Sequence, residues 1–239
     1  MNPIVLEMVK QDPIKNLWTC HSCIKKEERS TALKEVIVAE EEVVEESGKE
    51  RTEVRTSLRI LQWNAEAFAG KLFELTQRLQ EDEIDVCLIQ ESRLKENHQT
   101  PYIKGYKTIR SDRVGAFGGG LLSFVKKSLV VEETGKSAIE ANEISSFRIT
   151  LGKKKWINLA NVYIPPSSST AQTCELRLDT IPTLKSSIIC GDFNAHSALW
   201  DNNYPTDDRE EALVDWIFDK TCQSSTTEKQ HECTAPLAH

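Results

Sequence analysis

Five short apolar runs, each the length of one strand, restrict the folds open to this sequence more than any other feature. They are Leu58 to Trp63, Val86 to Gln90, Leu121 to Val125, Trp156 to Ile164 and Ser187 to Cys190. Runs of this kind are typical of buried strands. Leucines at positions 72, 75 and 79 repeat at helical spacing between the first two runs. Strands that alternate with helices predict a layered α/β architecture in which helices cover the faces of sheets.

A second helical pattern lies near the end of the chain. Ala212, Leu213, Trp216 and Ile217 recur at helical spacing, after an acidic stretch that suits a helix N-terminus. Upstream, the composition changes sharply at a glutamate-rich tract, Glu35 to Glu53. Such a tract buries too little apolar area to fold by itself. The sequence therefore predicts an N-terminal segment (1–34), an acidic linker (35–57) and one α/β domain (58–239).

Charge is distributed unevenly along the chain. The net charge is −7, yet the block from Arg93 to Lys155 holds 13 basic and 6 acidic residues, a local charge of +7. This block can face a polyanion such as DNA while the whole molecule stays acidic. An ordinary solvated surface explains the same charges at least equally well.

Cysteine usage and hydropathy favour an intracellular protein. The seven cysteines are an odd number without a framework spacing, which indicates reduced thiols. No apolar run approaches the roughly 20 residues that a membrane helix needs, and the first residues lack the apolar segment of a secretory signal. We therefore expect no membrane partner and a location inside the cell. The sequence leaves the oligomeric state open.

Four of the five apolar runs end in polar side chains that can do chemistry. Asn64 follows the first run, Glu91 the second, Tyr163 lies at the end of the fourth, and Asp192 and Asn194 follow the fifth. Strand ends present side chains from rigid elements at a shared edge, so these groups can converge on one site. Each of them alone also fits an ordinary strand end, core aromatic or turn.

Five ordered motifs contain these residues. They are LQWN at 61–64, IQES at 89–92, GGGL at 118–121, NVYIPP at 161–166 and GDFNAH at 191–196. In this order they resemble the endonuclease/exonuclease/phosphatase superfamily, and within it the apurinic-type endonuclease domain of non-LTR retrotransposons. The resemblance covers Leu58 to roughly Asp219. It implies a four-layer α/β sandwich, DNase I-like, and metal-dependent hydrolysis of a DNA phosphodiester.

The resemblance also implies roles for single residues. Glu91 is the expected metal ligand, because Mg²⁺ or Mn²⁺ binds through one or two carboxylates and keeps several waters. Asn64 is expected to hold Glu91 or a water on the metal, and Asp192 to orient and deprotonate the attacking water. Asn194 and Tyr163 are expected to donate hydrogen bonds to phosphate oxygens.

Three further residues complete the predicted site. Arg93 and Arg113 open the basic block and are expected phosphate contacts. His196, which follows the GDFN motif, is interpreted as a helper near the DNA or as a structural residue, and the structural interpretation is favoured.

The end of the sequence departs from the family pattern. The family closes with a Ser-Asp-His motif on a last strand, whose His binds the scissile phosphate. This chain ends Pro-Leu-Ala-His, with Ala238 in the place that the Asp needs. We therefore expect a C-terminally incomplete domain with an unpaired sheet edge and impaired nuclease activity.

A cysteine pair near the start remains to be explained. Trp18, Cys20 and Cys23 form a W-x-C-x-x-C block that resembles the closing corner of a PHD-type zinc finger. A complete zinc site needs four ligands, and besides the two cysteines only His21 lies here. The sequence predicts a metal-free remnant.

Three functions fit these observations. The leading one is a DNA endonuclease domain of a non-LTR retrotransposon polyprotein, whose parent would nick chromosomal DNA in the nucleus to prime reverse transcription. The second keeps the superfamily but changes the substrate to abasic DNA, RNA tails, phosphoinositides or sphingomyelin. The third is a non-catalytic nucleic-acid-binding or chromatin-binding remnant that uses the basic block and the partial cysteine pair, Cys20 and Cys23.

Overall fold

The computed structural model describes residues 4–8, 31–37, 57–115, 118–139, 141–152, 155–166, 176–183, 187–195 and 208–225. The elements in chain order are β1 (Ile4–Met8), β2 (Thr31–Ile37), β3 (Ser57–Asn64), α1 (Leu72–Glu81), β4 (Val86–Gln90), β5 (Tyr106–Ser111), β6 (Leu121–Lys126), β7 (Val130–Ile139), β8 (Asn142–Gly152), β9 (Lys155–Tyr163), the short 3₁₀ helix η1 (Leu178–Thr180), β10 (Ser187–Asp192) and α2 (Asp208–Ser225). Each of the five apolar runs forms a strand, and both predicted helices are present.

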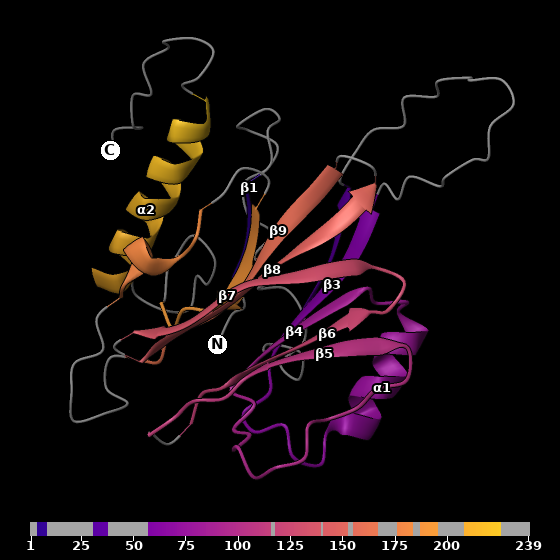
Figure 1. Ribbon diagram of the computed structural model, residues 1–239. Coiled ribbons are helices and arrows are strands. Elements are labelled where there is room, and N and C mark those ends of the chain that lie inside the picture. Colours follow the sequence, from indigo (N-terminus) through magenta and orange to yellow (C-terminus); the bar gives the residue numbers. More distant parts are fainter. Residues whose placement is uncertain are drawn as a thin grey trace, which may run out of the picture.

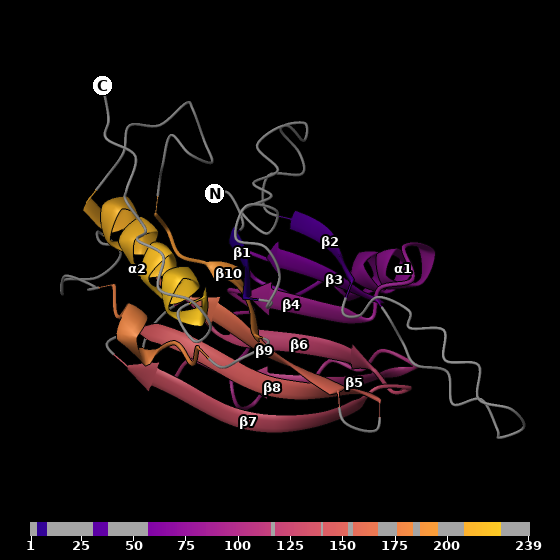
Figure 2. The same ribbon diagram turned by 90° about the horizontal axis from the view of Figure 1, so that it is seen from above.

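Two five-stranded sheets pack face to face (Figures 1 and 2). Sheet A has the strand order β1-β10-β9-β8-β7, and sheet B has the order β2-β3-β4-β6-β5. The pairs β9–β10 and β3–β4 are parallel, and the other pairs are antiparallel. The carboxyl ends of two parallel neighbours lie at the same sheet edge, so each sheet presents two strand ends together.

The main core lies between the two sheets. Successive side chains of a strand point to opposite faces, so alternate residues of both sheets meet in this space. The apolar members from the central strands are Leu58, Ile60, Val86, Leu88, Phe147, Ile149, Ile157, Leu159, Ile188 and Cys190. Full burial of one such large apolar side chain contributes about 1.5–3 kcal/mol to folding.

Towards the carboxyl ends of β3, β4 and β9, the same inner faces become polar. Gln62, Gln90 and Asn161 are buried there. Gln62 donates to Gln90, and Gln90 Nε2 donates to Asn161 Oδ1 at 2.6 Å. Asn161 Nδ2 donates back to the carbonyl of Ile89 at 3.1 Å. A buried polar group without a partner costs about 1–3 kcal/mol, so this chain of amides favours one alignment of the two sheets.

The two helices cover the outer faces of the sheets, one on each side (Figure 1). Leu75 and Leu79 of α1 pack on sheet B, and Leu213 and Ile217 of α2 pack on sheet A. The described layers therefore follow the order α1, sheet B, sheet A, α2, as the sequence predicts. No helix among the described residues has both the length and the apolar character needed to cross a membrane.

Strands β1 and β2 come from segments that the sequence analysis places outside the α/β domain. β1 pairs antiparallel with β10, and β2 pairs antiparallel with β3. β2 crosses the predicted boundary at residue 34, so the structure differs from the expected linker at residues 35–37. An exposed strand edge offers unpaired backbone groups to any extended segment, which therefore needs no apolar pattern of its own. Cys20, His21 and Cys23 lie outside the described residues.

Candidate active site

The predicted site residues lie where the inner faces of the two sheets reach the end of the sandwich. Asn64 is the last residue of β3 and Glu91 follows β4, while Tyr163 and Asp192 are the last residues of β9 and β10. Asn64 has the strand parity of Leu58 and Ile60, which face sheet A, so the site continues the inter-sheet core with polar groups. The fold therefore brings together four side chains that the sequence places up to 128 positions apart.

Asn64 links the two sheets at this end. Its Nδ2 donates to Glu91 Oε1 at 3.0 Å and to Asp192 Oδ2 at 2.6 Å. Its Oδ1 accepts the backbone N–H of Glu66 at 3.0 Å, which fixes the orientation of the amide. Asn64 and Glu91 belong to sheet B and Asp192 belongs to sheet A. One side chain thus holds two carboxylates in a fixed relation across the inter-sheet space.

Asp192 is buried, with 3% of its surface exposed. Burial raises its pKa, against the lowering effect of hydrogen bonds from Asn64 and the backbone N–H of Asn194. The latter bond, to Asp192 Oδ1, measures 3.0 Å. Gly191 allows β10 to lie close to β9, because a Cβ at this position would lie 2.2 Å from the carbonyl oxygen of Val162. A carboxylate with a raised pKa is a better proton acceptor than an exposed one.

Glu91 accepts hydrogen bonds from Arg93 and Asn64, and the Tyr163 hydroxyl lies beside it. Burial pushes its pKa upward, but these three side chains together outweigh burial, and the pKa falls below its ordinary value. The ion pair with Arg93 Nη2 measures 2.7 Å, and the Glu91 side chain is 12% exposed. Glu91 is therefore an anion at neutral pH that remains accessible at the rim.

Tyr163 is almost fully buried beside these carboxylates. Its hydroxyl faces Glu91, and its pKa is raised by burial and by the negative charges of Glu91 and Asp192. The guanidinium carbon of Arg113 lies 5.5 Å from the centre of its ring. The phenol consequently keeps its proton and serves as a hydrogen-bond donor.

Asn194 follows Asp192 by two positions in the sequence. Its Nδ2 donates to the carbonyl of Ile164 at 2.8 Å, and its Oδ1 is buried without a hydrogen-bond partner in the described structure. Because Nδ2 carries two hydrogens, one remains for a phosphate oxygen, and the predicted bond to phosphate stays a prediction.

The three remaining predicted residues differ in their positions. Arg93 contacts Glu91 at the rim with its side chain 36% exposed. The Arg113 side chain is 8% exposed and forms an ion pair with Glu143. His196 lies outside the described residues. The phosphate contacts expected of Arg93 and Arg113 stay predictions.

The backbone around the rim is strained. Glu66, Glu91, Arg93 and Asn194 all have φ between 46° and 50°, in the left-handed region. Such conformations cost non-glycine residues on the order of 1–3 kcal/mol each and cluster at functional sites. No residue-type pattern signals them in advance, so the sequence analysis misses this feature.

Sequence reasoning also misses one buried side chain, Glu143. It lies near the start of β8, opposite Tyr163 in the strand register, and its side chain is 5% exposed. Burial raises its pKa against the effect of Arg113 and of the Gly120 backbone N–H. Its stretch of sequence is polar and carries no motif, so only the tertiary contact with Arg113, thirty positions earlier, reveals it.

The donor set fits a hard divalent cation that keeps most of its waters. Glu91 offers a carboxylate at the rim, and Asn64 places an amide beside it. Mg²⁺ and Mn²⁺ favour such oxygen donors. Among the described residues, no group of three or more His, Cys, Asp and Glu side chains is placed to enclose a metal. The arrangement therefore suits an open site with one protein carboxylate.

Comparison with known proteins agrees with the motifs. Residues 157–236 match the family Exo_endo_phos_2, described as endonuclease-reverse transcriptase, and this segment contains Tyr163, Asp192 and Asn194. This segment is about a third of the chain, and over it the chain is similar to endonuclease-reverse transcriptases. The match leaves out Cys20 and Cys23, so the zinc-finger remnant stays a prediction. None of the curated proteins matches the chain.

Several solved structures are similar to this chain. The endonuclease domain of TRAS1, a telomere-specific non-LTR retrotransposon, is 20% identical over 68% of this chain and 70% of that chain, with a TM-score of 0.48. The catalytic domain of APE2 from Xenopus laevis is 21% identical over 67% and 66%, with a TM-score of 0.49. An AP endonuclease from Archaeoglobus fulgidus is 16% identical over 68% and 70%, with a TM-score of 0.46.

Proposed function

We propose that this chain carries the metal-binding and water-positioning part of a phosphodiesterase site, and that its substrate is DNA. The proposal places it as the endonuclease domain of a non-LTR retrotransposon polyprotein, whose parent nicks chromosomal DNA in the nucleus to prime reverse transcription. The observation that carries it is the contact of Asn64 with both Glu91 and Asp192. The family match to endonuclease-reverse transcriptases supports the choice of substrate.

Each residue has a defined task in this proposal. Glu91 would hold Mg²⁺ or Mn²⁺, and Asn64 keeps its carboxylate in place. A divalent cation supplies Lewis acidity and neutralises charge on the phosphate when it is bound. Asp192, whose pKa burial raises, accepts the proton of the attacking water.

Tyr163 and Arg93 supply the complementary positive potential. The Tyr163 hydroxyl keeps its proton and donates a hydrogen bond as charge builds on the phosphate. Arg93 is partly exposed beside Glu91 and can turn its guanidinium from that carboxylate to a phosphate oxygen. Binding of a cation at Glu91 would favour this exchange, because the carboxylate then no longer needs Arg93 as its counter-ion.

The rate of hydrolysis should be low in this chain. The Ser-Asp-His motif that closes the family pattern is not found in the sequence. Loss of one group that stabilises the charge of the transition state typically costs about 10²–10³-fold in rate. The basic block from Arg93 to Lys155 favours a second candidate function, a non-catalytic nucleic-acid-binding domain.

Nicking of supercoiled plasmid DNA with Mg²⁺ tests the proposal. The 239-residue chain should nick very slowly or not detectably, and a version extended by a complete Ser-Asp-His ending should nick in an Asp192-dependent manner. DNA binding without nicking by the extended version would favour the non-catalytic alternative. Robust nicking by the unextended chain would show that another residue fills the role of the terminal His.

A further inference from the structure

A buried ion pair beside the candidate site has no part in the chemistry proposed above. Arg113 Nε donates to Glu143 Oε1, and the two side chains are only 8% and 5% exposed. Arg113 also donates through Nη2 to the carbonyl of Ala141. Desolvation makes buried ion pairs costly, and apolar replacements are often neutral or stabilising. Stability alone is therefore a weak reason for a charged pair at this position.

The pair contacts the site first through Tyr163. The Arg113 guanidinium lies over the Tyr163 ring, 5.5 Å from its centre, at a distance where a cation is attracted to the ring face. Glu143 is the strand partner of Tyr163 in the β8–β9 register. The ring whose hydroxyl reaches Glu91 is thus held by Arg113, and Arg113 is held by Glu143.

The pair contacts the site a second time through the glycine motif. Glu143 Oε2 accepts the backbone N–H of Gly120 at 2.6 Å. The carbonyl of Gly120 accepts the N–H of Ser92 at 3.0 Å, and the carbonyl of Gly119 accepts the N–H of Arg93 at 2.9 Å. Glu143 therefore supports, through two glycines, the backbone that directly follows Glu91.

The glycine at 119 is itself a consequence of the pair. A Cβ at this position would lie 2.3 Å from Glu143 Oε1 and 2.6 Å from Arg113 Nε. The φ of Gly119 is +66°, which side chains also disfavour. The second glycine of the GGGL motif thus leaves room for the ion pair.

We propose that Arg113 and Glu143 are positioning residues that together brace the site across the two sheets. Glu143 and Tyr163 belong to sheet A, whereas Glu91 and the glycines adjoin β4 and β6 of sheet B. The brace holds the Tyr163 ring through Arg113, and it holds the backbone after Glu91 through Gly119 and Gly120. It thereby positions the Tyr163 hydroxyl relative to the Glu91 carboxylate. It rests on the proposed function, because its value lies in aligning these two groups for phosphodiester hydrolysis.

Fluorine NMR of the full chain labelled with 3-fluorotyrosine tests the brace independently of activity. The chain has four tyrosines, so the Tyr163 signal can be assigned with Tyr163→Phe. Arg113→Lys and Glu143→Gln should each shift or broaden the Tyr163 signal and leave the Tyr106 signal unchanged. The matched control is Arg110→Lys, the same change in the Arg110–Asp112 ion pair, which should leave the Tyr163 signal in place.

Two results would overturn the brace. One is an unchanged Tyr163 signal in folded Arg113→Lys and Glu143→Gln. The other is a displacement of all four signals together with a lower melting temperature, since that pattern marks a purely structural role. Arg113→Lys keeps the charge of the pair, so it preserves the test if Glu143→Gln does not fold.

Nicking kinetics add a second readout. In the version that carries the complete Ser-Asp-His ending, Arg113→Lys should lower kcat by about 10-fold without raising KM, because it misaligns a donor rather than removing a binding contact. The same change in a Tyr163→Phe background should have no further effect, whereas additive losses would contradict action through Tyr163. If the version that carries the complete Ser-Asp-His ending shows no Asp192-dependent nicking at all, the proposed function fails and the fluorine signals alone decide the brace.

Discussion

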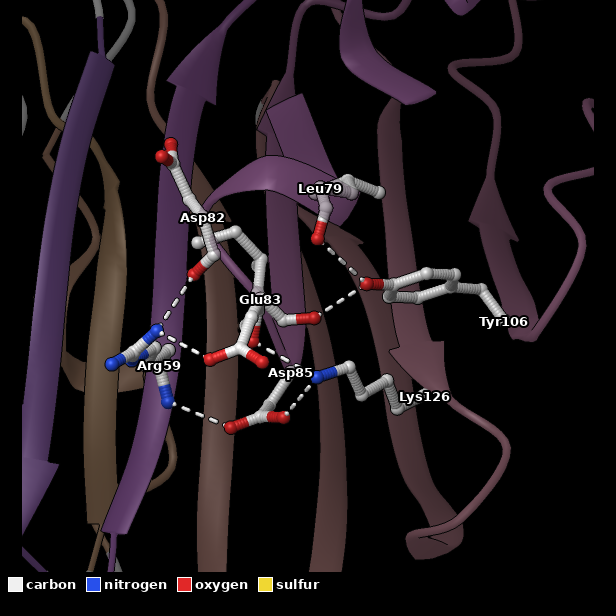
Figure 3. A network of polar contacts seen from close by, with 8 residues as sticks. Arg59, Leu79, Asp82, Glu83, Asp85, Tyr106 and Lys126 are labelled. Atoms are coloured by element: carbon white, nitrogen blue, oxygen red, sulfur yellow. Dashed lines mark hydrogen bonds and ion pairs between the residues drawn. The ribbon is translucent and has the colours of Figure 1, made fainter. Parts of the chain in front are cut away.

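The sandwich holds a buried carboxylate near each of its two ends, and the two are bound differently. Asp85, which precedes β4, is 2% exposed, and Asp192, which ends β10, is 3% exposed. Asp85 pairs with Lys126 Nζ at 2.9 Å and accepts the backbone N–H of Arg59 at 3.0 Å (Figure 3). The hydrogen bonds that Asp192 accepts from the described residues come from neutral amides, and the Glu91 charge lies nearby.

The polar groups around Asp85 supply one another with hydrogen-bond partners. Lys126 Nζ also donates to the carbonyl of Glu83 at 2.9 Å, and the Tyr106 hydroxyl donates to the carbonyls of Ile84 and Leu79 at 2.5 and 3.2 Å (Figure 3). The turn between α1 and β4 is thereby fixed to strands β3, β5 and β6. A buried carboxylate with its own cation and satisfied neighbours stabilises a turn.

The Asp192 end retains negative charge instead. Two carboxylates share one amide there, burial raises the pKa of Asp192, and the surrounding backbone is strained. Such costs persist in folded proteins mainly where function requires them. Both carboxylates are buried, so burial alone does not distinguish the two ends, whereas an incomplete internal counter-charge at Asp192 does.

The largest effect is expected when Asp192 is removed. In the version that carries the complete family ending, Asp192→Ala should lower the nicking rate by about 10³-fold, because the water loses its proton acceptor. Plasmid nicking under single-turnover conditions measures this rate. Asp85→Asn is the control at the other end of the sandwich. If both variants lose the same fraction of activity per folded molecule, the proposed difference in function between the two ends is wrong.

The next effect concerns stability at the other end. Lys126→Met leaves Asp85 buried without its cation and should lower the free energy of unfolding by about 2 kcal/mol, somewhat less than for a fully buried pair because the Lys126 side chain is 28% exposed. Urea unfolding measures the loss. A variant as stable as the wild type would show that the ion pair at this end is not needed for the fold.

A smaller effect is expected at Tyr106. Burial, and next the negative charge of Asp85, raise the pKa of its hydroxyl to about 12. The proton needed for both hydrogen bonds is therefore fully present below pH 10, and their contribution is lost as the pH rises through about 12. Tyr106→Phe should cost about 1 kcal/mol at pH 7. Equal urea midpoints for the two proteins at pH 7 would contradict this.

The smallest effect is a pH dependence of stability at Asp192. Because burial raises its pKa above the ordinary 3.8, the folded state disfavours the charged form, and the penalty builds up as the pH rises from 3.8 to the folded pKa. Asp192→Asn should therefore be more stable than the wild type at pH 7, and the difference should vanish near pH 3. Urea unfolding without divalent metal at both pH values measures it. A gain of the same size at both would assign the effect to packing instead of charge.

Much of this fold is predictable because its central strands are buried on both faces. β4 and β10 are buried at every position, so they appear in the sequence as uninterrupted apolar runs. β7 is almost entirely exposed and β8 alternates between Phe147, Ile149 and outward polar residues, so neither forms such a run. β1 (IVLEM) and β2 (TALKEVI) pair with β10 and β3, and local sequence does not specify these distant partners.

The site also has a part that local sequence predicts and a part that depends on tertiary structure. Asn64, Glu91, Tyr163 and Asp192 are predictable because each ends or follows a buried run. Their mutual contacts depend on how the two sheets align, as does the buried position of Arg113, which the sequence analysis expects to contact phosphate. The partner of Arg113, Glu143, lies in a polar stretch and becomes significant only through that alignment.

Cation binding by the 239-residue chain tests most directly whether the two ends differ in function. Electron paramagnetic resonance of added Mn²⁺ measures free against bound metal and does not depend on turnover. The account predicts weak Mn²⁺ binding that Glu91→Gln abolishes and that Glu83→Gln, the same change at the exposed edge of the Asp85 network, leaves intact. Binding that survives Glu91→Gln, or that disappears with Glu83→Gln, would contradict it.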